Sequence, residues 1–202
     1  MKYDPQKHHR RSIRLQGYDY SRPGAYFVTI VTYGRVCLFG EIVEGRMRLN
    51  GVGQIVQREW RRLGQRFPNV QLGTFMIMPN HIHGILIIHG DVVGATLSSQ
   101  TRHPSGKENE PTEALSGNSG SPLPPRPHGP AAGSLGAIIG QFKSRITKRL
   151  WTHAGLSGTP IWQRNYYEQI IRTDDEHRRI HAYIASNPAH WNTDDQNPAR
   201  PQ

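Results

Sequence analysis

A stretch of 43 residues, 91–133, cannot belong to a packed core, and it constrains the fold more than any other part of the sequence. It holds seven Pro, six Gly and six Ser, and it has no Phe, Tyr or Trp. Such a composition cannot bury enough apolar surface to offset the entropy lost on ordering. We therefore interpret 91–133 as a disordered or loosely attached insertion, and we expect a single domain over 25–190 to draw its core from the flanking segments.

Both flanking segments show the apolar patterns of strands and helices. β-Branched and aromatic runs predict strands at 25–33, 70–78 and 81–88, and an irregular strand or hairpin at 36–49. Helical spacing of apolar residues predicts helices at 52–67, 134–151 and 173–187. Residues 159–171 are expected to form a short strand or an irregular segment. The resulting order, β-β-α-β-β-α-β-α, favours an α+β fold with helices packed on an antiparallel sheet.

The strand predicted at 81–88 begins with His81-Ile82-His83. Side chains alternate along a strand, so the two histidines share one face, about 6–7 Å apart, while Ile82 faces the core. Two imidazoles in this arrangement form half of a divalent-metal site. The alternative is a pair of solvent-facing histidines on a half-exposed strand, and the pattern alone does not decide between them.

The last predicted helix supplies a possible second half of the site. Tyr183 and Asn187 lie one turn apart, on the same face as Ile180 and Ile184. Alone, they indicate a boundary tyrosine and a helix end before Pro188. Combined with His81 and His83, Asn187 gives a third ligand for Mg²⁺ or Mn²⁺, and the Tyr183 hydroxyl can attack a phosphate that such a metal polarises.

Zinc hydrolysis is the less favoured chemistry. It requires a third His or carboxylate ligand and a nearby general base, and the remaining histidines show no spacing that supplies one. The sequence also contains no P-loop, no dinucleotide-binding glycine pattern and no Gly-x-Ser-x-Gly motif.

The charge balance points to a polyanionic partner. The formal net charge is +10 and the sequence pI is about 10.2, which indicates nucleic acid or an anionic surface. Basic residues gather in an N-terminal arm, 1–24, which contains Arg10, Arg11 and Arg14. Two interpretations of this arm remain open: it contacts phosphate groups, or it is a solvated terminus. Further arginines in the helix at 52–67 contact DNA or form a solvated basic face.

Several features predict a cytoplasmic protein. The chain has no stretch of 18 apolar residues, its N-terminus lacks the apolar segment of a signal peptide, and Cys37 is its single cysteine. We therefore expect no membrane span and no disulfide within the chain. The polar tail, 191–202, is expected to be frayed.

Six stretches together resemble a known class of proteins. They are RSIRLQGYDY (11–20), GAYFVT (24–29), MPNHIHG (78–84), QFKS (141–144), IWQRNYY (161–167) and YIASNP (183–188). In this order they resemble the single-tyrosine transposases of the HUH (His-hydrophobic-His) class, of the insertion-sequence type, and more closely the REP-associated tyrosine transposases. Apart from the insertion and the tail, the resemblance covers nearly the whole chain.

The resemblance implies a ferredoxin-like HUH domain that nicks and rejoins single-stranded DNA bearing hairpins, in the nucleoid, as a monomer or a homodimer. It implies His81, His83 and Asn187 as ligands of Mg²⁺ or Mn²⁺, and Tyr183 as the nucleophile that forms a 5′-phosphotyrosine intermediate. Further residues assigned to DNA binding are Gln141, Lys143, Tyr166 and Tyr167, together with Arg10, Arg11 and Arg14 of the arm. The insertion departs from the compact family pattern without touching these positions.

Two other functions remain open from the sequence. One is a non-catalytic module that binds hairpin or sequence-specific nucleic acid through its basic arm and its arginine-rich helix. The other is a metal-dependent phosphodiesterase that uses water, whose cleavage would not need Tyr183.

Overall fold

The computed structural model of the chain describes residues 22–90 and 130–200. The predicted basic arm, with Arg10, Arg11 and Arg14, lies outside these residues, and so does most of the predicted insertion at 91–133. Within the described ranges, none of the helices has the length and apolar content that a membrane crossing requires.

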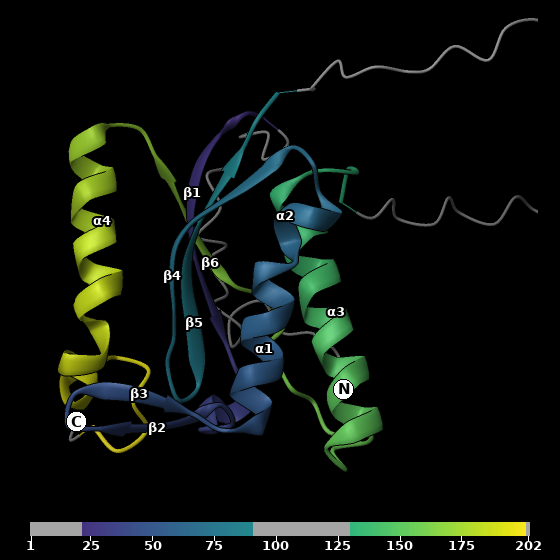
Figure 1. Cartoon of the computed structure of the whole chain (residues 1–202), viewed down its shortest axis with the longest axis vertical. Helices are drawn as coiled ribbons and strands as arrows, with labels where there is room; N and C mark the ends of the chain where they lie inside the picture. The colour runs from purple at the N-terminus through teal and green to yellow at the C-terminus, as the bar shows by residue number, and fades with distance from the viewer. Residues whose placement is uncertain (1–21, 91–129, 201–202) are drawn as a thin grey trace, which may run out of the picture. The chain divides into compact units, whose positions relative to one another are not determined.

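A four-stranded antiparallel sheet organises the fold (Figure 1). Its strands are β1 (Gly24–Val31), β4 (Val70–Ile77), β5 (His81–Ile88) and β6 (Tyr167–Ile171). Their order across the sheet is β4-β5-β1-β6, and every neighbouring pair is antiparallel. Helices connect β1 to β4 and β5 to β6, which gives the strand order of a ferredoxin-like fold. The predicted α+β class is confirmed.

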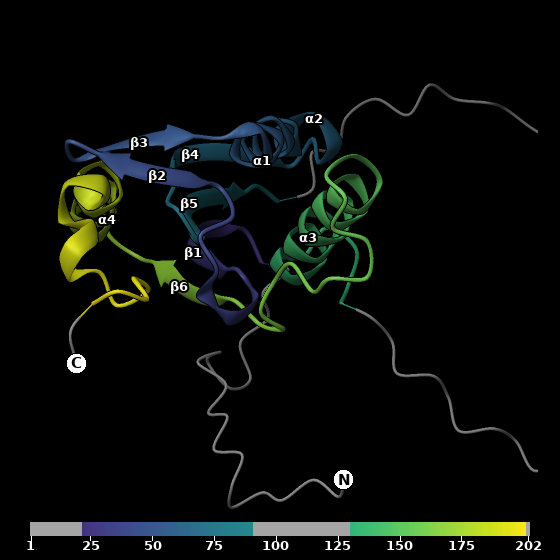
Figure 2. The ribbon, with the colours of Figure 1, turned by 90° about the horizontal axis from the view of Figure 1, so that it is seen from below.

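Helices cover both faces of this sheet (Figures 1 and 2). The helices α1 (Gly51–Arg61), α2 (Leu63–Arg66) and α3 (Leu135–His153) lie on one face, and α4 (Asp174–Ser186) lies on the other. The three long helices begin at polar N-caps whose side-chain oxygens accept a backbone N–H from the first turn: Asn50, Ser134 and Thr173.

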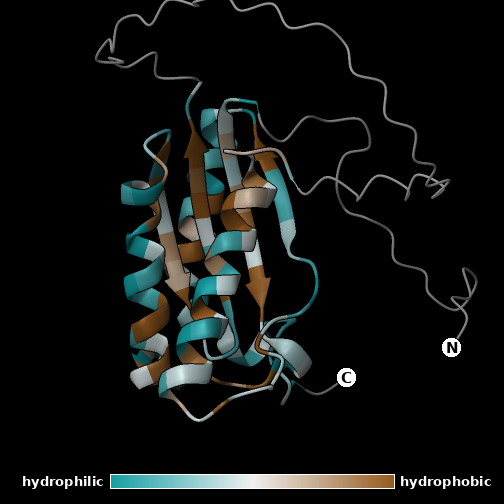
Figure 3. Ribbon diagram, turned by 90° about the vertical axis from the view of Figure 1, so that its right-hand side faces the viewer, coloured by the Kyte–Doolittle hydropathy of each residue, from teal (hydrophilic) through white to brown (hydrophobic). Residues whose placement is uncertain are grey.

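Side chains alternate between the two faces of the sheet along β1 and β5, so each face has its own apolar cluster, one larger than the other. The larger core, packed against α1 and α3, includes Tyr26, Val28, Ile30, Ile82 and Leu86. A smaller cluster on the other face contains Phe27 and Ile85 with Ile184 of α4. The strands are largely hydrophobic, whereas the helices in front of them carry hydrophilic turns (Figure 3). Because Ile82 faces the larger core, His81 and His83 share the opposite face, as the sequence predicts, and in the fold α4 covers that face.

A glycine in β5 holds the sheet close to α1. A Cβ on Gly84 would lie 2.3 Å from Cζ2 of Trp60, far inside van der Waals contact. Trp60 is fully buried, and its ring packs against those of Phe75 and Phe142. The position directly after His83 therefore has to be glycine for α1 to pack as it does.

In two segments the structure divides a predicted element into two. The irregular stretch at 36–49 contains a hairpin, β2 (Gly40–Val43) and β3 (Arg46–Leu49), which forms a separate two-stranded sheet. Its turn places Glu44 and Gly45 at positive φ, as a tight hairpin turn requires. The helix predicted at 52–67 is divided into α1 and α2.

The C-terminal segment is ordered as far as residue 200, so the prediction of a frayed tail is wrong. A 3₁₀ helix, η2 (Asn187–Thr193), continues directly from α4 past Pro188. Beyond it, the Gln196 carbonyl accepts a hydrogen bond of 2.7 Å from Asn80, which lies in the turn between β4 and β5. The tail thereby packs back against the beginning of the histidine strand.

Candidate functional site

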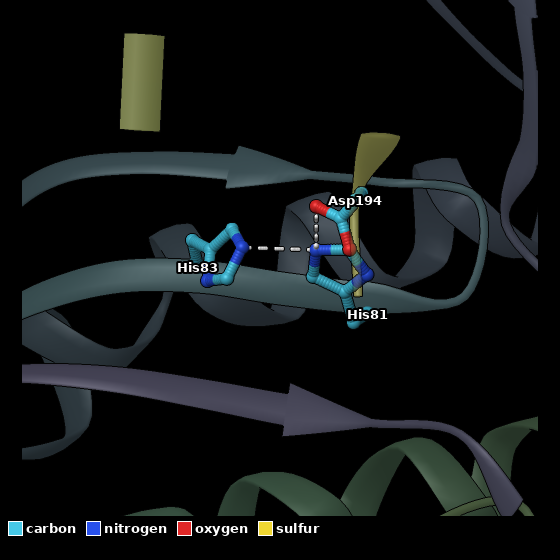
Figure 4. Close-up of side chains that lie close together, drawn as sticks. All are labelled: His81, His83 and Asp194. Carbon is cyan, nitrogen blue, oxygen red and sulfur yellow. Dashed lines mark hydrogen bonds and ion pairs between the residues drawn. The ribbon is translucent and has the colours of Figure 1, made fainter. Parts of the chain in front are cut away.

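His81 and His83 form a buried pair on the α4-facing side of β5. Their side chains are 0 % and 3 % exposed, and their Nε2 atoms lie 2.9 Å apart (Figure 4). Burial lowers the pKa of each imidazole to about 3. Both rings are therefore neutral at physiological pH, the state that binds a metal ion. The alternative of solvent-facing histidines is wrong.

Asn80 places the ring proton of His81 on Nδ1, and Thr29 allows the same tautomer for His83. The Asn80 amide nitrogen donates to two backbone carbonyls at 2.9 and 2.7 Å, so its Oδ1 accepts a hydrogen bond of 2.8 Å from Nδ1 of His81. The Thr29 hydroxyl lies 2.9 Å from Nδ1 of His83 and can accept its proton in the same way. Protons on both Nδ1 atoms leave both Nε2 lone pairs available to one ion.

Tyr183 reaches this pair from α4. Its hydroxyl lies 3.3 Å from Nε2 of His83, and its ring packs edge-on against Phe27. The side chain is 47 % exposed, so its hydroxyl stands at the border between the buried histidines and solvent. Burial, followed by the negative charge of Asp194, raises the pKa of Tyr183, while a hydrogen bond from Asn187 opposes the rise. The phenol is therefore protonated at neutral pH.

Asn187 lies one turn beyond Tyr183, at the junction of α4 and η2. It keeps helical φ and ψ, so it faces the same way as Tyr183 despite the following Pro188. The residue is 3 % exposed, and its Oδ1 has no hydrogen-bond partner among the described residues. A buried amide oxygen without a partner costs about 1–3 kcal/mol, so an unpaired Oδ1 here calls for a ligand.

Asp194 is a component that the sequence reasoning missed. It follows η2, its side chain is 5 % exposed, and its Oδ2 lies 3.8 Å from Nε2 of His81 (Figure 4). Its Oδ1 accepts a hydrogen bond of 2.6 Å from the Gln196 N–H, which directs Oδ2 toward the histidines. No periodicity in the sequence identifies Asp194 as a site residue, because it lies in an irregular segment that was interpreted as a polar tail.

These donors fit a divalent metal ion. One ligand atom each from His81, His83 and Asp194 lies within 4.8 Å of the others, and Asn187 lines the same cavity as His83 and Asp194. Around an octahedral ion with bonds of about 2.1 Å, adjacent ligands are about 3.0 Å apart; around a tetrahedral ion they are about 3.4 Å apart. The 2.9 Å between the two Nε2 atoms suits two adjacent ligands of one ion, whereas the 3.8 Å from Nε2 of His81 to Oδ2 of Asp194 is longer than either value.

The presence of Asp194 changes the argument about zinc. The sequence showed no third His or carboxylate for such an ion, whereas the fold brings a carboxylate beside the histidine pair. Two imidazoles and a carboxylate are a common zinc ligand set. A missing third ligand is therefore no longer an argument against zinc at this site.

The site opens into a groove of about 1610 Å³. His83, Tyr183, Asn187 and Asp194 line one part, residues 163–167 line another, and α3 contributes Lys143. A smaller hollow of about 410 Å³ shares His83, Tyr167 and Tyr183 with the groove and extends toward Gln169 and Arg179. An extended substrate could therefore pass on either side of the Tyr183 hydroxyl.

The residues assigned to DNA binding are not equivalent in the fold. Tyr166 and Tyr167 both line the groove, with Tyr166 packed partly on the core and Tyr167 exposed. Lys143 also lines it, but its ammonium donates to the carbonyls of residues 163–165 at 2.5–3.3 Å and so holds that loop in place. Burial lowers the pKa of Lys143 to about 8. Gln141 is exposed and does not line the groove.

Comparisons with known proteins match this chain to a relative in sequence and to solved structures. No protein-family model matches the chain. An uncharacterized protein of Haemophilus influenzae strain Rd is 37% identical over 193 residues, which are 96% of each chain. The structure of a REP-associated tyrosine transposase bound to a REP hairpin aligns with a TM-score of 0.52 and 17% identity, covering 87% of this chain and 72% of that one. At that identity the second match establishes a shared fold.

Proposed function

The chain belongs to the same family as the Haemophilus influenzae protein and shares its fold with a REP-associated tyrosine transposase, and from these premises we propose that it is a metal-dependent DNA strand transferase of that type. In this proposal Tyr183 is the nucleophile, and His81, His83 and Asn187 are the metal ligands, joined by Asp194. The observation that carries the proposal is the 3.3 Å between the Tyr183 hydroxyl and Nε2 of His83.

The reaction is a transesterification that begins at the Tyr183 hydroxyl. The phenolic oxygen forms a bond to a backbone phosphorus of single-stranded DNA, and the bond from that phosphorus to the 3′-oxygen breaks. The phenol loses its proton, the 3′-oxygen gains one, and the 5′-phosphate stays on Tyr183. One phosphodiester replaces another, so attack by a 3′-hydroxyl on the phosphotyrosine rejoins DNA without an external energy source.

The side chains around Tyr183 control when its proton leaves. Burial and Asp194 hold the phenol protonated, whereas the hydrogen bond from Asn187 favours the phenolate. Added positive charge in the cavity shifts this balance toward the phenolate. A bound Mg²⁺ or Mn²⁺ would supply that charge and polarise the scissile phosphate.

The substrate in this proposal is single-stranded DNA that carries hairpins. The similar solved structure holds a REP hairpin, and the net charge of +10 suits a polyanion. Tyr166 and Tyr167 line the groove, where bases could stack on their rings. Because Tyr183 and the histidines come from one chain, a monomer is sufficient for the chemistry, which would act on the DNA of the nucleoid.

The test is a covalent-adduct assay. We expect a hairpin-bearing single strand to become linked to the protein in the presence of Mg²⁺ or Mn²⁺, and the adduct to disappear in Tyr183→Phe and with EDTA. Tyr166→Phe and Tyr167→Phe are the matched controls from the same groove and should retain it. Loss of the adduct in either control, with retention in Tyr183→Phe, would overturn the assignment of the nucleophile. Tight hairpin binding without any adduct would favour the non-catalytic binding module.

Asp194 favours a second candidate function, that of a metal-dependent phosphodiesterase. With His81 and His83 it completes a ligand set that activates water in metal-dependent hydrolases. A phosphodiesterase of this kind would cut single-stranded DNA equally well after Tyr183→Phe and would never form an adduct. The assay above separates the two functions directly.

A further inference from the structure

The helix face opposite the Tyr183 site carries a cluster of four arginines around one buried carboxylate. Glu59 of α1 is 1 % exposed and accepts from Arg66 at 2.7 Å and from Arg62 at 3.2 Å. Across the interface, Arg149 and Arg145 of α3 approach it at 3.1 and 3.6 Å. These five residues, the Glu59 cluster, tie α1 and α2 to α3.

The cluster has a large excess of positive charge. Burial alone would raise the pKa of Glu59, but the hydrogen bond and charge of Arg66, with Arg149 and Arg62, hold it below its usual value. Glu59 is therefore ionised at neutral pH and offsets one of four guanidinium charges. It is also the single acidic residue in 51–66 and α3, which carry eight Arg and Lys residues: Arg58, Arg61, Arg62, Arg66, Lys143, Arg145, Lys148 and Arg149.

Helix α4, on the other face of the sheet, shows no such excess. Its first turn holds Asp174, Asp175 and Glu176, followed by Arg178 and Arg179. The positive field is therefore concentrated on the layer formed by α1, α2 and α3, which faces the viewer in Figure 3. Separation of charge on this scale favours a polyanion on one side of the molecule.

The arginines pair with Glu59 and still expose much of their side chains to solvent. Arg62 and Arg145 have side chains 47 % and 49 % exposed, and Arg149 is 39 % exposed. Each of the four guanidinium groups contacts Glu59 through one nitrogen, and Nη1 of Arg66 is buried without a hydrogen-bond partner among the described residues. A guanidinium has five N–H donors, so most remain available for phosphate oxygens.

We propose that the Glu59 cluster is a second nucleic-acid site, which binds the phosphate backbone of double-stranded DNA through Arg62, Arg145 and Arg149. The site reads charge and not sequence, because its donors are guanidinium groups on an outer helix face. Glu59 is a positioning residue that pairs with the arginines without touching DNA. The inference deepens the proposed function by giving the duplex part of a hairpin its own surface, apart from the groove that takes the single strand.

The test compares arginines on the two faces of the sheet. Binding of a blunt DNA duplex to the full chain is measured by fluorescence anisotropy over a salt series for the wild type, for Arg145→Ala/Arg149→Ala, and for Arg178→Ala of α4. Each lost phosphate contact reduces the slope of log K against log [salt] by about 0.9. We expect the α3 variant to lose about 1.8 and the α4 variant to keep the wild-type slope.

Two further measurements make the result decisive. Arg145→Lys/Arg149→Lys keeps the charge and should keep the slope, which separates phosphate contact from helix packing. The α3 alanine variant should also form the Tyr183 adduct normally on an unstructured single strand. An unchanged slope in the α3 alanine variant, or an equal effect on single-stranded binding, would overturn the inference. A slope change in a protein that forms no adduct would preserve it while removing the proposed function.

Discussion

Acidification should destabilise the fold through His81 and His83. In the folded chain burial lowers the pKa of each to about 3, whereas the ordinary value in an unfolded chain is 6.5. Between pH 7 and pH 5 the unfolded chain therefore takes up protons at these positions, and the folded chain does not. Protonation of the unfolded state lowers the free energy of unfolding as pH falls, and the loss continues until the folded rings themselves titrate near pH 3.

The two pKa values determine the size of this effect. Over the interval from pH 7 to pH 5, a shift from 6.5 to about 3 removes about 2 kcal/mol per histidine, or about 4 kcal/mol for the pair. Domains of this size are typically stable by about 5–15 kcal/mol, so the predicted loss is a large share of the total.

Urea unfolding at pH 7 and pH 5 measures the loss, with EDTA present so that bound cations make no contribution. His83→Gln removes one of the two groups, so its pH-dependent loss should be smaller than that of the wild type by about 2 kcal/mol. His181→Gln, at an exposed position on α4, is the matched control and should behave as the wild type does. Equal pH-dependent losses in the wild type and His83→Gln would refute the account of two buried neutral imidazoles.

Three further substitutions test the residues that pack beside, orient or complete the metal site. Gly84→Ala should cost about 1–3 kcal/mol in urea unfolding because its Cβ would meet Trp60, whereas Gly140→Ala, in open space on α3, should not destabilise; equal effects would contradict the packing argument. Thr29→Val removes the partner of His83 Nδ1 and should weaken Mn²⁺ binding about 10–100-fold in calorimetry; unchanged affinity would show that Thr29 does not orient the ring. Asp194→Asn should weaken Mn²⁺ binding more than Asp195→Asn, its exposed neighbour, and the reverse order would remove Asp194 from the ligand set.

The sheet and the direction of the histidines could be predicted because strand alternation is a local property. The position of Ile82 in a β-branched run decides which way His81 and His83 point, whatever surrounds the strand. The common face of Tyr183 and Asn187 was equally predictable from helical spacing. That this face meets the histidines depends on the packing of α4 on the sheet, which the pattern of α4 alone does not determine.

The parts that could not be predicted depend on contacts between distant segments. Asp194 reaches His81 because the tail is bound to Asn80 through a hydrogen bond that spans 116 residues. Glu59 reads in the sequence as one acid on an arginine-rich helix, and only the packing of α1 on α3 adds Arg145 and Arg149 to it. No periodicity within a single element encodes either arrangement.

The central claim is that Tyr183 carries the DNA, and mass spectrometry of the trypsin-digested adduct tests it most directly. Cleavage after lysine and arginine separates the candidates, because Tyr166 and Tyr167 fall in the peptide 165–172 and Tyr183 falls in 180–202. The account predicts that the nucleotide mass is found on 180–202, at Tyr183. A nucleotide mass on 165–172, or DNA cleavage with no modified peptide, would contradict it.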